Sequence, residues 1–387
     1  MLHKYFYYYI SLRDLKKIGV KRIENTRLVG DINESRLRFL LLSRRIKARN
    51  MLNNRTVTII DYDNPLPLLG SLSFGFIDRG TNIIEVRPMT SCNMDCIYCS
   101  VGEGTNPELH DYFVDMDYLL EWAERIVREK RELDPEIRIY FLINPQGEPL
   151  LYPYIYGLVK GLKEISGVGK VGIVTNGALL DEQMVDKLIS FGLDSLHVSL
   201  EGTSSEVGKL YGKPYPVNRV INALRHAAKK RLEIYLTPVW IKGLNDRGIE
   251  EVVLLGKELA SLGGVVKYGI QNYLVYKHGK KIKEYREASW QEFYDFLKEL
   301  EERHGVKLLL SKEEAEIIDS KHLKKPFHRD EIVEGIISAP GRYRNEYLAV
   351  ASDRVITITT KKNLTIGRKI KIKITRDKDN IFYGLIV

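Results

Sequence analysis

The chain has 387 residues and a formal net charge of +9, with 44% hydrophobic and 29% charged residues. This composition is typical of a globular protein rather than a disordered one, and the length predicts two or three domains. No apolar stretch reaches the roughly 18 residues of a membrane-spanning helix. The aromatic first segment is soon followed by charges and does not resemble a signal peptide, so we expect a cytoplasmic protein without a membrane partner.

The first eighty residues predict an accessory α+β extension. Residues 31–49 have the charged, amphipathic pattern of a helix. Residues 55–62 and 72–77 have the β-branched character of strands, and the turn-forming Asn64-Pro-Leu-Pro67 lies between them. We therefore expect these two strands to form a pair within an extension that covers residues 1–80.

From residue 81 to 315 short β-branched runs alternate with amphipathic helical stretches. The predicted strands cover residues 83–87, 137–143, 171–174, 195–200, 232–240 and 265–275. The predicted helices cover residues 116–132, 155–165, 181–191, 217–230, 248–262 and 289–304. Near-continuous apolar strands separated by helices indicate an α/β fold with parallel pairing and right-handed crossovers.

The last part of the chain changes pattern and is basic. Residues 316–330 predict a basic linker, and residues 331–387 predict a small all-β barrel of five short strands at 331–339, 347–351, 354–360, 368–375 and 381–386. This C-terminal module holds eleven basic and six acidic residues, about half of the net excess. Between residues 367 and 375 isoleucine alternates with a basic residue, which predicts one apolar and one basic strand face. A solvated face without a ligand is the alternative.

All three cysteines of the chain, Cys92, Cys96 and Cys99, lie in one C-x3-C-x2-C loop after the first predicted barrel strand. Three thiolates can hold a [4Fe–4S] cluster and leave one iron open to a small molecule. A zinc site completed by His110 and three unrelated buried thiols are the alternatives at this point. A disulfide framework is least consistent with an odd count.

The loop resembles the signature of the radical S-adenosylmethionine (radical SAM) superfamily, which has an aromatic residue before its last cysteine. Tyr98 fills that place. The resemblance implies a partial (βα)6 TIM-like barrel, a [4Fe–4S] cluster on Cys92, Cys96 and Cys99, and S-adenosylmethionine on the open iron. An electron from the cluster would then yield a 5′-deoxyadenosyl radical. A low-potential donor such as a ferredoxin or flavodoxin is the implied redox partner.

Three further motifs match this family at successive strand ends. They are Gln146-Gly-Glu-Pro149, Thr175-Asn-Gly177 and Ser199-Leu-Glu-Gly202. Gln146 departs from the more common glycine. The resemblance implies that the cofactor is bound by Gly147, Glu148, Thr175, Asn176, Ser199 and Glu201, with Glu148 on the ammonium group and Ser199 on the carboxylate or ribose. An ordinary turn or helix cap is the alternative for each.

With all three thiols used for one cluster, no cysteine remains for a second cluster or for methyl transfer through a cysteine. The C-terminal barrel is similar to the TRAM module of RNA-modifying enzymes. We therefore expect a radical SAM oxidoreductase or transferase that modifies a nucleoside in tRNA or rRNA, with phosphates contacted by Arg342, Arg344, Lys369, Lys371 and Lys373. An enzyme acting on a small metabolite or peptide, with the C-terminal barrel as a lid, is the alternative. A zinc-dependent RNA-binding protein without catalysis is a more distant one.

Overall fold

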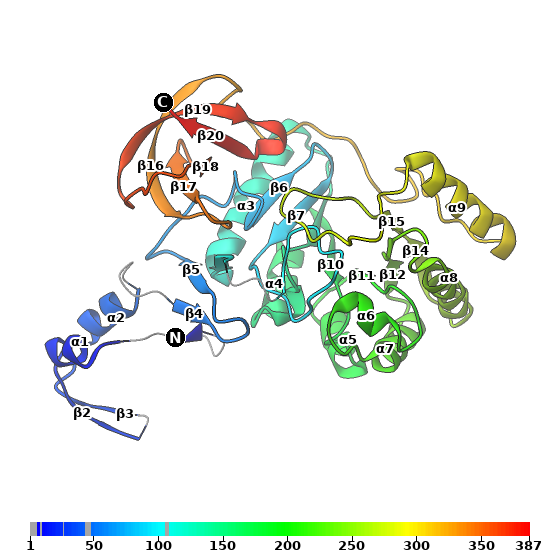
Figure 1. Ribbon diagram of the computed structural model, residues 1–387, viewed down its shortest axis with the longest axis horizontal. Coiled ribbons are helices and arrows are strands. Elements are labelled where there is room, and N and C mark those ends of the chain that lie inside the picture. The colour runs from blue at the N-terminus through cyan, green and yellow to red at the C-terminus, as the bar shows by residue number, and fades with distance from the viewer. Residues whose placement is uncertain (1–5, 8–9, 26, 43–47, 105–107) are drawn as a thin grey trace.

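The computed structural model describes residues 6–7, 10–25, 27–42, 48–104 and 108–387 (Figure 1). The α-helices are α1 (Leu12–Lys17), α2 (Glu34–Leu42), α3 (Met116–Leu133), α4 (Ile155–Glu164), α5 (Glu182–Ser190), α6 (Val207–Tyr211), α7 (Val217–Lys229), α8 (Asp246–Ser261) and α9 (Trp290–His304). In the described ranges no helix is both long and apolar enough to cross a membrane.

The first fifteen strands belong to the N-terminal region and the central α/β domain. They are β1 (Phe6–Tyr7), β2 (Val20–Glu24), β3 (Arg27–Gly30), β4 (Ala48–Asn50), β5 (Thr56–Ile60), β6 (Gly75–Asp78), β7 (Ile83–Arg87), β8 (Asp111–Val114), β9 (Ile139–Ile143), β10 (Val168–Thr175), β11 (Ser195–Val198), β12 (Glu233–Leu236), β13 (Val239–Trp240), β14 (Val265–Tyr268) and β15 (Gln271–Asn272). The remaining strands are β16 (Ile332–Pro340), β17 (Glu346–Ala351), β18 (Arg354–Thr359), β19 (Lys369–Arg376) and β20 (Phe382–Ile386).

The centre of the molecule is a seven-stranded sheet in the order β14-β12-β11-β10-β9-β7-β6. Six of its strands pair in parallel, and β6 joins the edge antiparallel to β7. Helices α3, α4, α5, α7 and α8 lie between successive parallel strands and bury their apolar faces. The predicted partial (βα)6 barrel is confirmed, and it brings the carboxyl ends of its strands to one edge.

The N-terminal region differs from the expected strand pair. β5 pairs with β4 and, in parallel, with β8, whereas β6 pairs with β7 and so joins the central sheet. The pairing predicted between residues 55–62 and 72–77 is therefore wrong, because β5 pairs with β4 and with the distant β8, whereas β6 pairs with the next strand in the chain, β7. The helix predicted over residues 31–49 is shorter, since α2 covers Glu34–Leu42 and β4 begins at Ala48; residues 43–47 of that prediction lie outside the described residues.

The C-terminal strands form a closed barrel in the order β16-β17-β18-β20-β19. All neighbours pair antiparallel except β18 and β20, which are parallel. The five strands predicted from the sequence are confirmed within one or two residues. The alternation in β19 is also confirmed: Ile370, Ile372 and Ile374 fill the barrel, and the lysines between them point outward.

The C-terminal barrel packs directly against the central domain (Figure 1). Leu348 and Val355 belong to the same apolar core as the central sheet. Backbone hydrogen bonds reinforce this contact, because Val355 N donates to Leu69 O at 2.9 Å and Phe382 N donates to Gly70 O at 3.1 Å. A Cβ on Gly70 would lie 2.1 Å from Val355 O, so the close approach requires glycine.

Candidate active site

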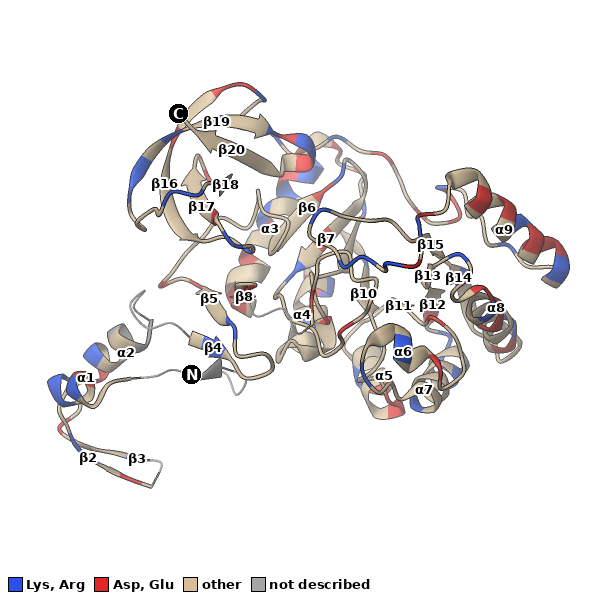
Figure 2. Cartoon of the chain, in the orientation of Figure 1, with Lys and Arg blue, Asp and Glu red and all other residues tan. Residues whose placement is uncertain are grey.

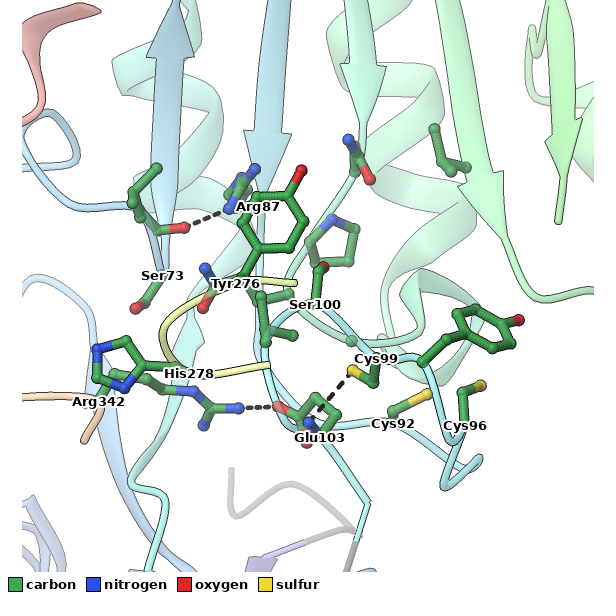
Figure 3. A pocket seen from close by; sticks show the side chains of 18 of the residues that line it. Ser73, Arg87, Cys92, Cys96, Cys99, Ser100, Glu103, Tyr276, His278 and Arg342 are labelled. Carbon is green, nitrogen blue, oxygen red and sulfur yellow. Dashed lines mark hydrogen bonds and ion pairs between the residues drawn. The ribbon is translucent and has the colours of Figure 1, made fainter. Parts of the chain in front are cut away.

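A cavity of about 970 Å³ opens at the carboxyl ends of the parallel strands. Its inner wall includes the three cysteines and the turns after β9, β10 and β11, and its outer wall includes residues of the C-terminal barrel. Figure 3 shows Cys92, Cys96 and Cys99 close together, with Arg87 and Tyr276 in another part of the cavity. In such folds ligands bind at this end of the strands, which makes this cavity the candidate active site.

The cysteine loop follows β7 and is held by neighbouring backbone. Asp95 N donates to Tyr211 O at 2.9 Å, and Ile97 N donates to Leu210 O at 3.0 Å. Two sulfurs accept hydrogen bonds from backbone amides: Cys92 Sγ from Met94 at 3.4 Å and Cys99 Sγ from Glu103 at 3.3 Å. Such N–H groups stabilise thiolates and tune clusters bound by them.

The donor set fits a cluster with three protein ligands. Burial raises the pKa of Cys96 to about 12 and also raises the pKa of Cys92 and Cys99, so the thiols favour their neutral form until a cation binds. His110 does not complete a zinc site, because its Nδ1 and Nε2 lie 2.8 and 2.7 Å from the hydroxyls of Thr56 and Thr58. Within the described part of the chain, no three His, Cys, Asp or Glu side chains are placed so that they could all bind one metal ion. A cubane cluster differs, because each thiolate binds a separate iron.

Gly147 lies against the cysteine loop. It forms an isolated bridge with Ser91, and a Cβ at this position would lie 2.0 Å from Ser91 O. The neighbouring Gln146 Oε1 lines the cavity and has no hydrogen-bond donor within the described ranges. Buried polar atoms are rarely unsatisfied in a loaded protein, so the turn offers an acceptor to a ligand such as an ammonium group.

Glu148 is buried behind the turn after β9. Its side chain is 1% exposed and is not part of the cavity lining. The carboxylate accepts hydrogen bonds from Thr175 Oγ1 at 2.6 Å, Asn176 N at 2.8 Å and Leu150 N at 3.0 Å. Burial raises its pKa to about 7. Glu148 therefore ties the turn after β9 to the turn after β10, and its expected contact with the cofactor stays a prediction.

The other predicted cofactor residues line the cavity as expected from their motifs. Thr175 and Asn176 follow β10, and Asn176 Nδ2 donates to Asn93 Oδ1 at 2.8 Å and to Cys92 Sγ at 3.6 Å. Ser199 lies 3.4 Å from the hydroxyl of Thr237. The structure thus brings all three motifs to the cysteine loop, and their ligand contacts stay a prediction.

Glu201 is a buried acid beside the cysteine loop. It accepts hydrogen bonds from Tyr98 OH at 2.8 Å and Val239 N at 2.7 Å. Burial raises its pKa to about 8 despite these two bonds, so the protonated form is favoured at neutral pH. The aromatic residue of the cysteine motif is therefore fixed by the motif after β11.

The five residues predicted to contact nucleic acid do not form one surface. Arg342 is 2% exposed and forms ion pairs with Asp111 at 2.6 Å and with Glu103, so its expected place on a surface track is wrong. Arg344 is exposed and lies 3.3 Å from Glu108. Lys369, Lys371 and Lys373 belong to β19 (Figure 2), and none of them lines the cavity.

Sequence reasoning missed most of the outer wall. Tyr343 stacks on His278 with ring centroids 3.7 Å apart, and its hydroxyl donates to Val101 O at 3.2 Å. Arg87, Glu103 and Arg376 also line the cavity. Glu103 lies four residues after Cys99, but nothing in its local pattern indicates a partner more than 200 residues away.

Comparisons with known proteins agree with this geometry. Residues 86–256 match the model of the radical SAM superfamily. An uncharacterised protein of Methanocaldococcus jannaschii is 31% identical, with 95% of this chain and 88% of that protein covered. A GTP 3′,8-cyclase of Peptoclostridium acidaminophilum is 29% identical over 46% of this chain and 52% of its own length. The chain thus spans about half of that relative.

The structure of SuiB from Streptococcus suis bound to S-adenosylmethionine is 17% identical, with 62% of this chain and 50% of that chain covered and a TM-score of 0.43. A score this low carries no argument about activity. The chain belongs to the family of the archaeal protein and contains a radical SAM superfamily domain. The predicted cofactors, a [4Fe–4S] cluster and S-adenosylmethionine, are those of this superfamily and are confirmed.

Proposed function

We propose that the chain is a radical SAM enzyme whose substrate is a small anionic molecule enclosed between the barrel mouth and the C-terminal barrel. The observation that supports this proposal is that the three cysteines and residues of the C-terminal barrel line one cavity. When bound, the cluster and S-adenosylmethionine supply a radical that abstracts a hydrogen atom from the substrate. A low-potential ferredoxin or flavodoxin of a reducing cytoplasm would supply the electron.

The charge of the cavity supports an anionic substrate. Arg87 is 8% exposed and lines the cavity; its Nη2 pairs with Glu85 at 2.7 Å, and its Nε has no acceptor in the described part of the chain. Arg376 and Lys277 line the same wall. Of the acids that line the cavity, Glu201 and Glu346 have a pKa raised by burial, which weakens their negative charge. The balance therefore favours a carboxylate or phosphate group.

The C-terminal barrel gives this chemistry a closed site. Thr357 and Tyr383 project from its strands into the lining, and Tyr343 reaches the cysteine loop. A radical reacts with whatever lies nearest, so excluding water and fixing the substrate prevents side reactions. This role agrees with the lid alternative rather than with a separate RNA-gripping module.

The test uses anaerobically reconstituted enzyme with S-adenosylmethionine and a reductant. A dialysate of cell extract should stimulate 5′-deoxyadenosine formation above the substrate-free rate, and the stimulating compound should bind an anion-exchange resin at neutral pH. The Cys92→Ala variant, which lacks a cluster ligand, should form no 5′-deoxyadenosine with the dialysate or with the macromolecules that the dialysis membrane retains. If only the RNA that the dialysis membrane retains stimulated 5′-deoxyadenosine formation, the small-molecule proposal would be overturned.

A second candidate is a nucleoside in tRNA or rRNA, with the C-terminal barrel acting as a TRAM-like module. The observation in its favour is the basic outer face of β19, where Lys369 and Lys371 are exposed. Acidic residues partly offset this face, since Lys373 lies 3.0 Å from Asp330 and Lys371 pairs across the strands with Glu334.

This candidate predicts that RNA binding depends on that face. Changing Lys369, Lys371 and Lys373 together to Gln should weaken binding and flatten its salt dependence by about 0.7 log units of slope per lost single-strand contact. Changing the exposed Lys209, Lys229 and Lys230 to Gln removes the same charge from the central domain and serves as the control. Equal salt slopes in the two triple variants would remove the support for RNA.

A further inference from the structure

Glu103 connects the cysteine loop to a buried group of charges. Its backbone N–H donates to Cys99 Sγ at 3.3 Å, and its carboxylate forms ion pairs with Arg55 at 2.7 Å and with Arg342. The residue is 3% exposed. One residue therefore contacts a predicted cluster ligand through its backbone and two cations through its side chain. Figure 3 shows its contacts with Cys99 and Arg342.

The two arginines come from opposite ends of the chain. Arg55 precedes β5, and Arg342 lies in the turn between β16 and β17 of the C-terminal barrel. Both also reach Asp111, at 3.4 and 2.6 Å, and both side chains are at most 2% exposed. Two cations and two anions make the group neutral when the C-terminal barrel is docked.

Withdrawal of Arg342 would break this balance. It would leave the buried carboxylates of Glu103 and Asp111 with one arginine, Arg55, between them. The excess negative charge would then lie close to Cys99, because the backbone of Glu103 contacts the sulfur of that cysteine. A buried charge without its partner acts over a long distance, because little water screens it. Reduction adds one electron to a cluster, so a negative charge nearby disfavours reduction and a positive charge favours it.

We propose that Arg342 and Glu103 are positioning residues through which docking of the C-terminal barrel sets the reduction potential at the cysteine loop. The docked C-terminal barrel supplies the arginine that neutralises Glu103, so one electron from the low-potential donor enters readily. Without this arginine, the unpaired carboxylate would oppose that electron. This inference rests on the cluster bound by the three cysteines and is independent of the substrate.

The decisive experiment is a redox titration of the reconstituted full-length protein, followed by electron paramagnetic resonance of the reduced cluster. Arg342→Gln removes a positive charge and should lower the midpoint potential, whereas Glu103→Gln removes a negative charge and should raise it. A unit charge at this range should change the ratio of reduced to oxidised cluster about tenfold, which corresponds to about 59 mV for one electron. The double variant should return close to the wild type.

Opposite shifts separate this inference from a purely structural role, because loosening of the loop would move both variants in the same direction. Arg354→Gln is the matched control: Arg354 is 5% exposed in the same barrel, but it contacts Lys324 O and Asp353 rather than the cysteine loop. Its potential should equal that of the wild type even if its stability falls.

The charge-conserving variants Arg342→Lys and Glu103→Asp should keep the wild-type potential more closely than the Gln variants. If Arg342→Gln fails to bind iron, Glu103→Gln measured against Glu103→Asp still decides the question. Shifts of equal sign, or no shift in either Gln variant, would overturn the inference. The substrate proposal is tested separately, by stimulation of 5′-deoxyadenosine formation.

Discussion

At the scale of single residues, buried titratable groups around the cavity are fixed by contacts within the protein. Glu148 accepts three hydrogen bonds from the turns it connects, and Glu201 holds Tyr98. His197 lies on the cavity wall, bonded to Tyr140 OH at 2.7 Å and stacked on Tyr235 with centroids 4.1 Å apart. Their environments rather than their residue types determine their charge.

The position of Glu148 predicts a linked loss of stability and affinity. Glu148→Ala leaves a buried hydroxyl and two amides without their acceptor, at roughly 1–3 kcal/mol for each unsatisfied group. We expect a lower free energy of unfolding in the apo protein and weaker S-adenosylmethionine binding, measured by denaturation and by calorimetry. Ser199→Ala is the comparison and should leave the stability almost unchanged. Weaker binding at full stability in Glu148→Ala would indicate a direct contact with the cofactor instead.

His197 predicts acid sensitivity. Burial, together with the charges of Lys170 and Lys267, lowers the pKa of this imidazole from 6.5 to about 3. Above pH 6.5 the ring is neutral in the folded and unfolded states, so its contribution to stability is fully present. Below pH 6.5 His197 is protonated in the unfolded chain but stays neutral in the folded one. The free energy of unfolding therefore falls by about 1.4 kcal/mol per pH unit down to pH 3.

The variant that tests this is His197→Gln, which cannot take up the proton. Urea denaturation of the apo proteins between pH 8 and pH 4 should show the wild type losing stability relative to the variant as the pH falls. A constant difference between the two proteins across that range would contradict the predicted titration.

At the scale of elements, the turn after β9 and the loop after β7 are fitted to each other at Gly147. Gly147→Ala would force the two apart, because Ser91 O lies 2.0 Å from the position of the new Cβ. We expect assembly of the cluster to persist at reduced yield and S-adenosylmethionine affinity to fall at least tenfold, about 1.4 kcal/mol.

The matched control is Gly208→Ala in α6, where the nearest heavy atom would lie 3.5 Å from the new Cβ. This substitution should be neutral or slightly stabilising, since alanine favours helix over glycine. Iron content and calorimetric affinity measured on both variants decide the prediction. Equal affinities would show that the turn can shift without cost.

At the scale of the whole molecule, the C-terminal barrel and the central domain share one core. Val355 and Leu348 belong to it, and both are at most 2% exposed. We therefore expect a single cooperative unfolding transition, with no separate melting of the C-terminal barrel.

Val355→Ala should lower the free energy of unfolding by roughly 2 kcal/mol and shift the whole transition, because it removes buried methyl groups at the junction. Ile366→Ala in the same C-terminal barrel, at a side chain that is 37% exposed, is the control and should change little. Calorimetry and tryptophan fluorescence report the transition. Two separate transitions in the wild type would contradict the shared core.

The sequence by itself determined the features that depend on local patterns. Alternating apolar strands and amphipathic helices predicted the parallel sheet, and the alternation of isoleucine and lysine predicted which face of β19 is buried. The spacing of Cys92, Cys96 and Cys99 indicated the cluster, because its ligands come from one short loop. Motifs at successive strand ends were expected to converge, since parallel strands end at one edge.

Tertiary structure decided the features that depend on partners far apart in the chain. The sequence predicted Arg342 as one more exposed cation of the basic module, but docking of the C-terminal barrel buries it against Glu103 and Asp111. The sequence predicted Glu148 as a ligand for an ammonium group, and the tertiary structure adds its hydrogen bond from Thr175. β5 pairs in parallel with the distant β8, whereas β6 pairs with the adjacent β7. The contacts of Arg342, of Glu148 and between β5 and β8 join segments more than 20 residues apart, and no local period encodes them.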